Sequence, residues 1–286
     1  MIVGGHVSHG SKSLKNIEII FHDILKVDLM SDDINNNWGM AGLLNRPIIY
    51  NIEQHHFDMR HATTHIAYGN LVIFYANSDQ ANKGWHTSEH ISLNAAETQR
   101  YTSYKSERAA QQFVQGRKMI RAMLASYLGV PAEDVGLSCQ EHVKPVAQCR
   151  TSSRPPPEFN LSHSGDWVVL AADRRTALGV DIECTPQRDI DAMTSLSDLF
   201  TQNERTYLEK QMEPDQKAHL FLQLWRGKEA VMKATGKGFE LAPNSFELLT
   251  LDGKFKDTIL AEARIWKLMQ IELRSGLDCA IAQQIT

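Results

Sequence analysis

Charged side chains at helical spacing single out the stretch Trp225–Gly238 of this 286-residue chain. Glu229 and Lys233 are four residues apart, so on a helix they share one flank. Lys228 falls inside the apolar stripe of the same predicted helix. Because burying an unpaired charge is costly, these side chains must be ion-paired or must hold a ligand. Taken alone, the stretch is also compatible with a surface ion pair.

Two carboxylates occupy alternate positions of a predicted strand. Asp181 and Glu183 point to one side of this strand, whereas Val180 and Ile182 point to the core. Carboxylates about 7 Å apart repel each other unless a cation lies between them. Mg²⁺ prefers hard oxygen ligands of this kind. The pattern therefore predicts either a magnesium site or an exposed, solvated pair.

Two further segments carry groups suited to phosphate. Ser162 and His163 lie where a short strand enters a turn of small residues, and hydroxyl, imidazole and backbone N–H groups can bind phosphate oxygens. A solvent-facing turn is the alternative. Arg117 lies on the apolar stripe of a second predicted helix, where its head group either binds a ligand or extends to the surface.

The elements that must position these residues follow from periodicity and from Gly and Pro. Apolar spacing predicts a long helix over Glu107–Leu128, ended by Gly129, and another from about Lys217 to the glycines near 238. Strands are expected at Leu71–Ala76, at 159–165 and in the tail from Phe246. Trp167–Ala172 and Ala177–Glu183 are interpreted as a hairpin, and the prolines at 155–157 as a flexible bridge.

Composition restricts the class of protein. The chain is 42% hydrophobic and 22% charged, and its net charge of -4 argues against general nucleic-acid binding. No run reaches the roughly 18 apolar residues of a membrane helix, and no secretion signal is visible. The four cysteines lack C-x-x-C spacing, so we expect reduced thiols in a cytoplasmic protein that has no membrane partner.

Residues 1–68 form an N-terminal extension of unknown role in this interpretation. Their periodicity is weak, and a chain starting at Met59 is expected to retain the catalytic core. His61 and His65 have the spacing of a helical zinc pair, but no third ligand is apparent, so metal binding is not expected there.

Three motifs then occur in one order: N-L-S-H-S-G from Asn160, G-V-D-I-E from Gly179, and L-W-R-G-K-E-A-V-M-K-A-T-G-K-G from Leu224. Together they resemble the 4′-phosphopantetheinyl transferases of the surfactin-synthetase-activating type. F-V-Q-G-R at 113–117 and V-K-P at 143–145 also match, although this family often has Gly where Val143 stands. The resemblance covers roughly residues 70–285.

The resemblance implies an α+β fold: a pseudo-twofold pair of similar halves, each an antiparallel sheet packed on a long helix. We place the N-terminal half at 69–158 and the C-terminal half, with the metal site, at 159–286. Coenzyme A would lie between the halves of a monomer. The implied reaction is the Mg²⁺-dependent transfer of 4′-phosphopantetheine from coenzyme A to a serine of an apo acyl or peptidyl carrier protein, with release of 3′,5′-ADP.

The resemblance also implies residue roles. The metal would be held by Asp181, Glu183 and Glu229. Glu229 would accept the serine proton, directly or through a bound water, and Lys233 would stabilise the leaving group. Contacts to coenzyme A are implied for Arg117, Lys144, Pro145, Ser162, His163, Lys228 and Lys233.

Other functions remain open at this stage. One is a non-catalytic coenzyme-A-binding protein of the same fold, and another is a different metal-dependent enzyme such as a nuclease. The complete acidic trio disfavours the first, and the negative charge disfavours the second. Lys118 and Arg226 lie off the apolar stripes and are candidates for docking an acidic carrier protein.

Overall fold

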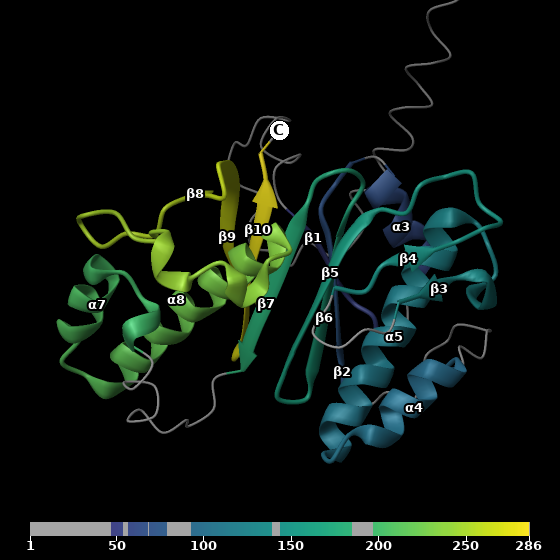
Figure 1. Cartoon of the computed structure of the whole chain (residues 1–286), viewed down its shortest axis with the longest axis horizontal. Coiled ribbons are helices and arrows are strands. Elements are labelled where there is room, and N and C mark those ends of the chain that lie inside the picture. Colours follow the sequence, from purple (N-terminus) through teal and green to yellow (C-terminus); the bar gives the residue numbers. More distant parts are fainter. Residues whose placement is uncertain are drawn as a thin grey trace, which may run out of the picture. The chain divides into compact units, whose positions relative to one another are not determined.

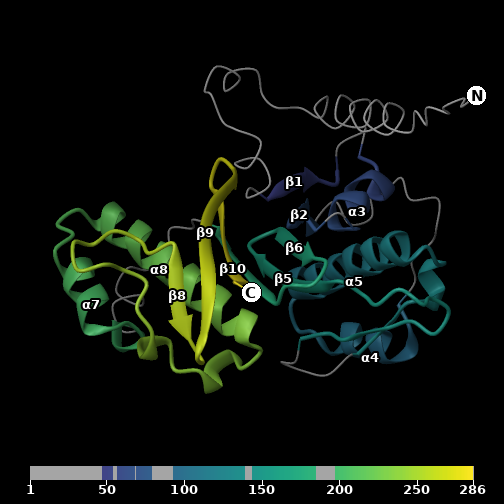
Figure 2. The same ribbon diagram turned by 90° about the horizontal axis from the view of Figure 1, so that it is seen from above.

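Two sheets stack face to face in the part of the chain that the structure describes, which comprises residues 47–53, 57–67, 69–78, 93–138, 144–184 and 197–285. This computed structural model has a long helix on the outer face of each sheet. Four layers therefore follow one another as helix, sheet, sheet and helix (Figure 1). Figure 2 shows the same order, from α8 through β9 and β10 to β5, β6 and α5.

The first sheet has the strand order β1-β2-β6-β5 and is antiparallel except for the pair β1–β2. Its strands are β1 (Ile48–Asn51), β2 (Val72–Asn77), β5 (Glu158–Ser164) and β6 (Trp167–Asp173). Side chains alternate between its two faces. On β2, Val72, Phe74 and Ala76 enter the core under the long helix, whereas Ile73 and Tyr75 pack toward the second sheet.

The helix on this sheet, α5 (Glu107–Leu128), begins and ends as its sequence predicts. The Ser106 hydroxyl accepts the backbone N–H of Ala109, which caps the first turn. Gly129 ends the helix with φ 70°, a left-handed conformation that favours glycine. The predicted bounds are confirmed because cap, periodicity and terminating glycine all agree.

The second sheet, with strand order β7-β10-β9-β8, is antiparallel throughout. Its strands are β7 (Leu178–Cys184), β8 (Thr258–Ala261), β9 (Arg264–Arg274) and β10 (Leu277–Gln284). The long helix α8 (Pro214–Thr235) packs on its outer face. α8 starts three residues before the predicted Lys217, because Pro214 fits the first turn of a helix, and Gly236 ends it at φ 75°.

Both halves share one topology. In each, a strand leads to a 22-residue helix and then to a hairpin whose second strand pairs antiparallel with that first strand. β2, α5, β5 and β6 thus correspond to β7, α8, β9 and β10. The α+β class and the pair of similar halves are confirmed.

Shorter elements complete the described chain. They are α3 (Met59–Ala67), α4 (Ala95–Ser103), β3 (Gly136–Leu137), β4 (Ala147–Gln148), α7 (Gln202–Glu209) and the single turns η2 (Ala132–Asp134), η3 (Ser197–Leu199), η4 (Gly238–Glu240) and η5 (Pro243–Ser245). Within the described ranges, every helix is too short or too polar to cross a bilayer.

The predicted hairpin of 167–172 with 177–183 is wrong. β6 pairs with β2 and β5, so both of its edges are occupied and β7 begins the second sheet. Because β5 and β6 complete the first sheet, the division between the sheets lies between β6 and β7 and not at 158/159. The proline segment at 155–157 lies inside the first half, just before β5.

The expected boundary at residue 68 also needs correction. β1 pairs with β2 in register Ile48 to Val72, and α3 buries Ala62 and Ile66 in the first core. The weak periodicity of this short strand and helix concealed their packing. The strand expected at the start of the tail is also absent from the described residues at 246–251, which form a loop with one isolated bridge between Leu249 and Phe255.

Candidate active site

The site forms along a seam where the edge strands β5 and β7 of the two sheets meet. Side chains of β5 substitute for a partner strand, because they accept backbone N–H groups of β7. The acceptors are Asn160 Oδ1, Ser162 Oγ and Ser164 Oγ, and the donors are Val180, Ile182 and Cys184, at 3.0, 3.3 and 3.1 Å. The two-residue repeat of both strands sets this register.

The same two hydroxyls orient the predicted metal ligands. Ser162 donates to Oδ1 of Asp181 at 2.9 Å, and Ser164 donates to Oε2 of Glu183 at 2.8 Å. Each serine therefore accepts from the β7 backbone and donates to a β7 carboxylate. The S-x-S and D-x-E patterns act as one unit, although sequence reasoning treated them separately and assigned Ser162 to phosphate.

α8 brings the remaining charges to the seam. The Lys233 ammonium lies 2.6 Å from Asp181 Oδ1, 3.3 Å from Glu229 Oε2 and 3.1 Å from Ser162 Oγ. Helix and strand approach closely because Gly179 lacks a side chain. A Cβ at this position would lie 2.2 Å from the carbonyl oxygen of Ala230.

Electrostatics couples these groups. Burial opposes the charge of Lys233, but the carboxylates of Asp181 and Glu229 outweigh this effect and raise the pKa of the lysine. Burial raises the pKa of Glu229, and the neighbouring carboxylates of Asp181 and Glu183 add to this rise against the opposing effect of Lys233. The carboxylates crowd each other, and the Lys233 ammonium partly compensates them.

The donor set fits a hard divalent cation. Oδ2 of Asp181 is buried and has no hydrogen-bond partner among the described residues, so this acceptor is available to a ligand. Carboxylate oxygens are the atoms that Mg²⁺ prefers. In the described ranges, no three His, Cys, Asp or Glu side chains are already arranged as a metal site. Instead the Lys233 ammonium lies between Asp181 and Glu229.

His163 lies beside this cluster. It alternates with Ser162 and Ser164 on β5, so its ring points to the opposite side of the strand, where it is solvent-accessible. The surrounding protein nevertheless lowers the pKa of His163, and the Lys233 charge lowers it further. The ring is therefore held toward its neutral form, which can both donate and accept a hydrogen bond.

Lys228 does not reach the seam. Its ammonium is fully buried, pairs with Glu204 Oε2 at 2.8 Å and bonds the carbonyl oxygen of Phe246. Glu204 also accepts the N–H of Leu248 and caps α7, so its carboxylate has several donors. Burial lowers the pKa of Lys228 against the opposing effect of Glu204. The lysine has no surface left for the predicted phosphate contact.

Arg226 is also buried, at 2% exposure, which corrects its prediction as a docking residue. Its Nη2 lies 3.3 Å from Oδ2 of Asp278, and its Nε has no hydrogen-bond partner in the described part of the chain. Asp278 pairs with Glu183 in the β10–β7 register. Burial lowers the pKa of Arg226, although the carboxylates of Asp278 and Asp181 oppose the change. The arginine thus supplies positive charge near the acidic strand.

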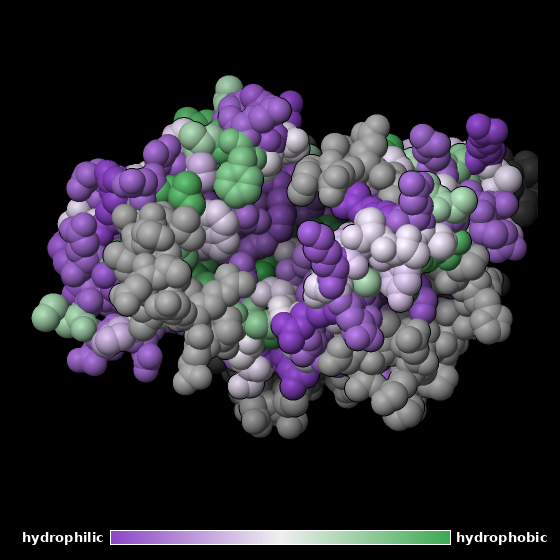
Figure 3. All heavy atoms as spheres, turned by 60° about the horizontal axis from the view of Figure 1, so that its bottom comes forward, coloured by the Kyte–Doolittle hydropathy of each residue, from purple (hydrophilic) through white to green (hydrophobic). Residues whose placement is uncertain are grey.

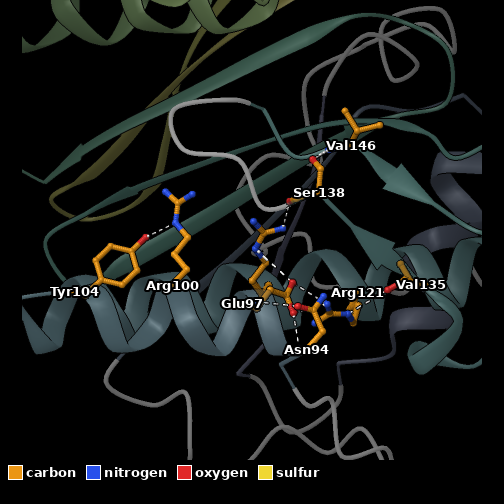
Figure 4. Close-up of polar contacts among 9 residues, drawn as sticks. Asn94, Glu97, Arg100, Tyr104, Arg121, Val135, Ser138 and Val146 are labelled. Carbon is orange, nitrogen blue, oxygen red and sulfur yellow. Dashed lines mark hydrogen bonds and ion pairs between the residues drawn. The ribbon is translucent and has the colours of Figure 1, made fainter.

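Glu97 and Arg121 form a buried ionic network in the first half (Figure 4), and Arg117 belongs to it as well. Glu97 has no exposed surface, accepts from Arg121 at 2.7 and 2.6 Å and lies 3.7 Å from Arg117 Nε. Arg117 also donates to the carbonyl of Ser138 at 2.9 Å and lies over the Phe113 ring. The network joins α4, α5 and the end of β3. Sequence reasoning missed Glu97, although the Asn-x-x-Glu capping pattern that contains it marks the start of α4.

Residues 139–143, which include Val143, lie outside the described part of the chain. Lys144 and Pro145 follow them directly. The Lys144 ammonium is 3.1 Å from Oε2 of Glu158, and both Lys144 and Pro145 are half-buried. Figure 3 shows a hollow in the middle of one face, between the second half at left and the first half at right, with hydrophilic side chains along its visible wall.

Sequence comparison divides the chain at the same place as the sheets. Residues 81–175 match the family described as "4′-phosphopantetheinyl transferase, N-terminal", and residues 177–281 match the "4′-phosphopantetheinyl transferase superfamily". The first match ends and the second begins at the connection between β6 and β7.

Individual relatives agree with these matches. A Bacillus subtilis protein named 4′-phosphopantetheinyl transferase is 33% identical over 137 residues, which is 48% of this chain and 57% of that protein. A human L-aminoadipate-semialdehyde dehydrogenase-phosphopantetheinyl transferase is 31% identical over 172 residues, which is 56% of this chain and 54% of the relative. The chain thus spans little more than half the length of these relatives.

Proposed function

The chain belongs to the 4′-phosphopantetheinyl transferase superfamily, and on this basis we propose that it transfers 4′-phosphopantetheine from coenzyme A to a serine of an apo acyl or peptidyl carrier protein. The second product is 3′,5′-ADP. The observation that carries the proposal is the convergence of Asp181, Glu229 and Lys233 at the seam, from motifs far apart in the sequence.

The carboxylates have the role of metal ligands. Asp181, Glu183 and Glu229 would hold Mg²⁺, and the buried, unpartnered Oδ2 of Asp181 supports this assignment. The ion would neutralise charge on the coenzyme A diphosphate. The serine hydroxyls of β5 keep two of these carboxylates in position when no ligand is bound.

Lys233 and Glu229 have the catalytic roles. The serine oxygen of the carrier attacks the β-phosphorus of coenzyme A, and the bond from that phosphorus to the oxygen of the departing 3′,5′-ADP breaks. Glu229 accepts the serine proton. Two carboxylates keep Lys233 protonated, so its ammonium stabilises the charge that develops on the leaving phosphate. Positioning and charge neutralisation provide most of the catalysis, as in other phosphoryl transfers.

The first half would bind the nucleotide end. His163 is accessible beside the cluster and is assigned to a phosphate oxygen. Lys144, Pro145 and Arg117 are assigned to the 3′-phosphate and adenine. Arg117 acts from within its ionic network, so its role requires the ligand to reach a largely buried guanidinium. The hydrophilic hollow of Figure 3 is the place that we propose for the coenzyme.

Reduced thiols at Cys149, Cys184 and Cys279 support a cytoplasmic location, and we expect the protein to act as a monomer. A non-catalytic coenzyme-A-binding protein of the same fold is the second candidate. The complete acidic set at the seam disfavours it, because binding alone does not require a proton acceptor beside a metal site.

Mass spectrometry of apo-carrier proteins tests the proposal. A panel of acyl and peptidyl carriers is incubated with coenzyme A and Mg²⁺, each beside a variant whose acceptor serine is replaced by alanine. We expect the intact carrier to gain one phosphopantetheine group and the alanine variant to gain none. Coenzyme A binding without any mass gain across the panel would instead identify the protein as a binder.

A further inference from the structure

A pocket of about 160 Å³ is lined by three arginines and lies apart from the carboxylate seam. Its lining residues are Ala67, Tyr127, Arg154, Pro155, Arg174 and Arg175. Arg174 and Arg175 follow the last residue of β6 and precede β7, whereas Asp181 is the middle residue of β7 and Glu183 lies near its far end. The first half of that strand therefore separates the pocket from the carboxylates of the seam.

Backbone carbonyls fix two of the guanidinium groups. Arg154 donates to the carbonyl oxygen of Tyr127 at 2.7 Å and lies over the Tyr127 ring at 5.0 Å. Arg174 donates to the carbonyl oxygen of Ala67 at 3.0 Å. These carbonyls set the direction of each guanidinium without neutralising its charge. The remaining N–H groups stay available to a ligand.

Asp173, the residue before Arg174 and Arg175, uses its carboxylate oxygens for other hydrogen bonds. Asp173 is 3% exposed, and one of its oxygens accepts the backbone N–H groups of Arg175 and Thr176 at 2.9 and 2.7 Å. Its other oxygen accepts from Gln283 at 3.0 Å. Within the described ranges, none of the three arginine side chains forms an ion pair with a carboxylate. The pocket thus concentrates positive charge in a chain of net charge -4.

We propose that this pocket binds a phosphate group, either as inorganic phosphate or as a phosphomonoester. A guanidinium presents a planar fork of donors that matches phosphate oxygens, and its hydration is weaker than that of an ammonium group. Several waters fit the stated volume, so it accommodates a tetrahedral anion of that size. This inference does not depend on the proposed transfer reaction.

Isothermal titration calorimetry with inorganic phosphate tests the proposal, with NaCl used to keep the ionic strength constant. Arg175→Gln is the informative variant, because the Arg175 side chain makes no hydrogen bond or ion pair within the described residues and its loss leaves the fold intact. Arg264→Gln is the matched control: it removes the same charge from another exposed arginine without an ion pair. We expect phosphate affinity to fall about 10-fold or more in Arg175→Gln and to stay unchanged in Arg264→Gln.

Glycerol 2-phosphate, titrated in parallel, distinguishes the two sources of the phosphate group. Tighter binding of the ester than of inorganic phosphate, again lost in Arg175→Gln, assigns the pocket to a phosphomonoester. Tighter binding of inorganic phosphate assigns it to the free ion. Equal affinity of wild type, Arg175→Gln and Arg264→Gln for both probes would overturn the proposal, because binding would then reflect net charge or another site.

Discussion

Two lysines on α8, five residues apart, carry their charges into different surroundings. Lys233 is partly exposed at the seam, where two carboxylates raise its pKa. Lys228 is fully buried, where desolvation lowers its pKa and Glu204 supplies the compensating charge. Because the two side chains are chemically identical, the ion-pair partners of each lysine determine whether its ammonium group can contact a ligand. Lys228 is a structural residue of the second half.

Replacing Lys228 by Met leaves the Glu204 carboxylate buried without its ion-pair partner. We expect Lys228→Met to lower the free energy of unfolding by about 3–5 kcal/mol, measured by urea denaturation. The double variant Lys228→Met with Glu204→Gln removes both charges, so it should recover part of this loss.

The double variant also separates structure from ligand binding. If Lys228 is structural, the folded double variant keeps its affinity for coenzyme A. A large loss of coenzyme A affinity in that variant, with stability retained, would show that Lys228 contacts the coenzyme, as the family resemblance implies.

The contact of α8 with β7 holds the proposed catalytic residues together. Gly179 permits this approach: an added Cβ would lie 2.2 Å from the carbonyl oxygen of Ala230 and 2.3 Å from the backbone nitrogen of Ala234. These neighbours are backbone atoms of a helix, so they cannot rotate away. The distance from Lys233 to Asp181 therefore depends on Gly179, which lies two residues before Asp181 on β7.

Gly179→Ala should push the helix away from the strand. We expect the free energy of unfolding of Gly179→Ala to fall by about 1–3 kcal/mol or more. We also expect slower transfer, because Lys233 and Asp181 move apart. Gly116→Ala is the matched control, since its Cβ would meet only the flexible end of the Leu161 side chain. Equal and small effects of the two substitutions would show that the α8–β7 contact does not position the site.

Sequence patterns predicted elements well where local signals agreed. α5 was predicted to its end residues because periodicity, the helix start and Gly129 coincide. The strands β6 and β7 were also predicted, yet their pairing was not, since a strand buried on both faces gives no sign of which sheet it joins. The strand that pairs with each edge can lie far away in the sequence. The short connection between β6 and β7 suggested that these two strands pair with each other, which is wrong.

The candidate site was also predicted only in part. Asp181, Glu229 and Lys233 were selected from spacing and resemblance, and they do come together. The ion-pair partner of Lys228 and the burial of Arg226 were not foreseen, because helical periodicity gives the direction of a side chain but not the partners that other segments supply. Glu204, the partner of Lys228, lies 24 residues before it in the sequence. Asp278, the partner of Arg226, lies 52 residues after it.

For the whole molecule, the described part of the fold begins before the family resemblance does. β1 extends the first sheet, and Ile52 is buried in its core. A chain that starts at Met59 loses this strand and exposes the edge of β2. We expect it to unfold at lower urea concentration than a chain that starts at Pro47, because only the latter keeps the β1–β2 pairing. Equal unfolding midpoints would show that β1 contributes nothing to stability.

Asp181→Asn shows whether the seam cluster performs the proposed transfer. The amide preserves the shape of the side chain and an acceptor for Ser162, so the fold should persist. It removes the negative charge that faces Lys233 and the proposed Mg²⁺. The measurement is the rate of mass gain of an apo-carrier protein, with coenzyme A affinity determined on the same sample and the exposed Asp257→Asn as control. We predict that Asp181→Asn slows the transfer by about 100-fold or more while the control retains the wild-type rate. A folded Asp181→Asn protein that transfers at the wild-type rate with Mg²⁺ would show that the seam cluster does not perform the transfer.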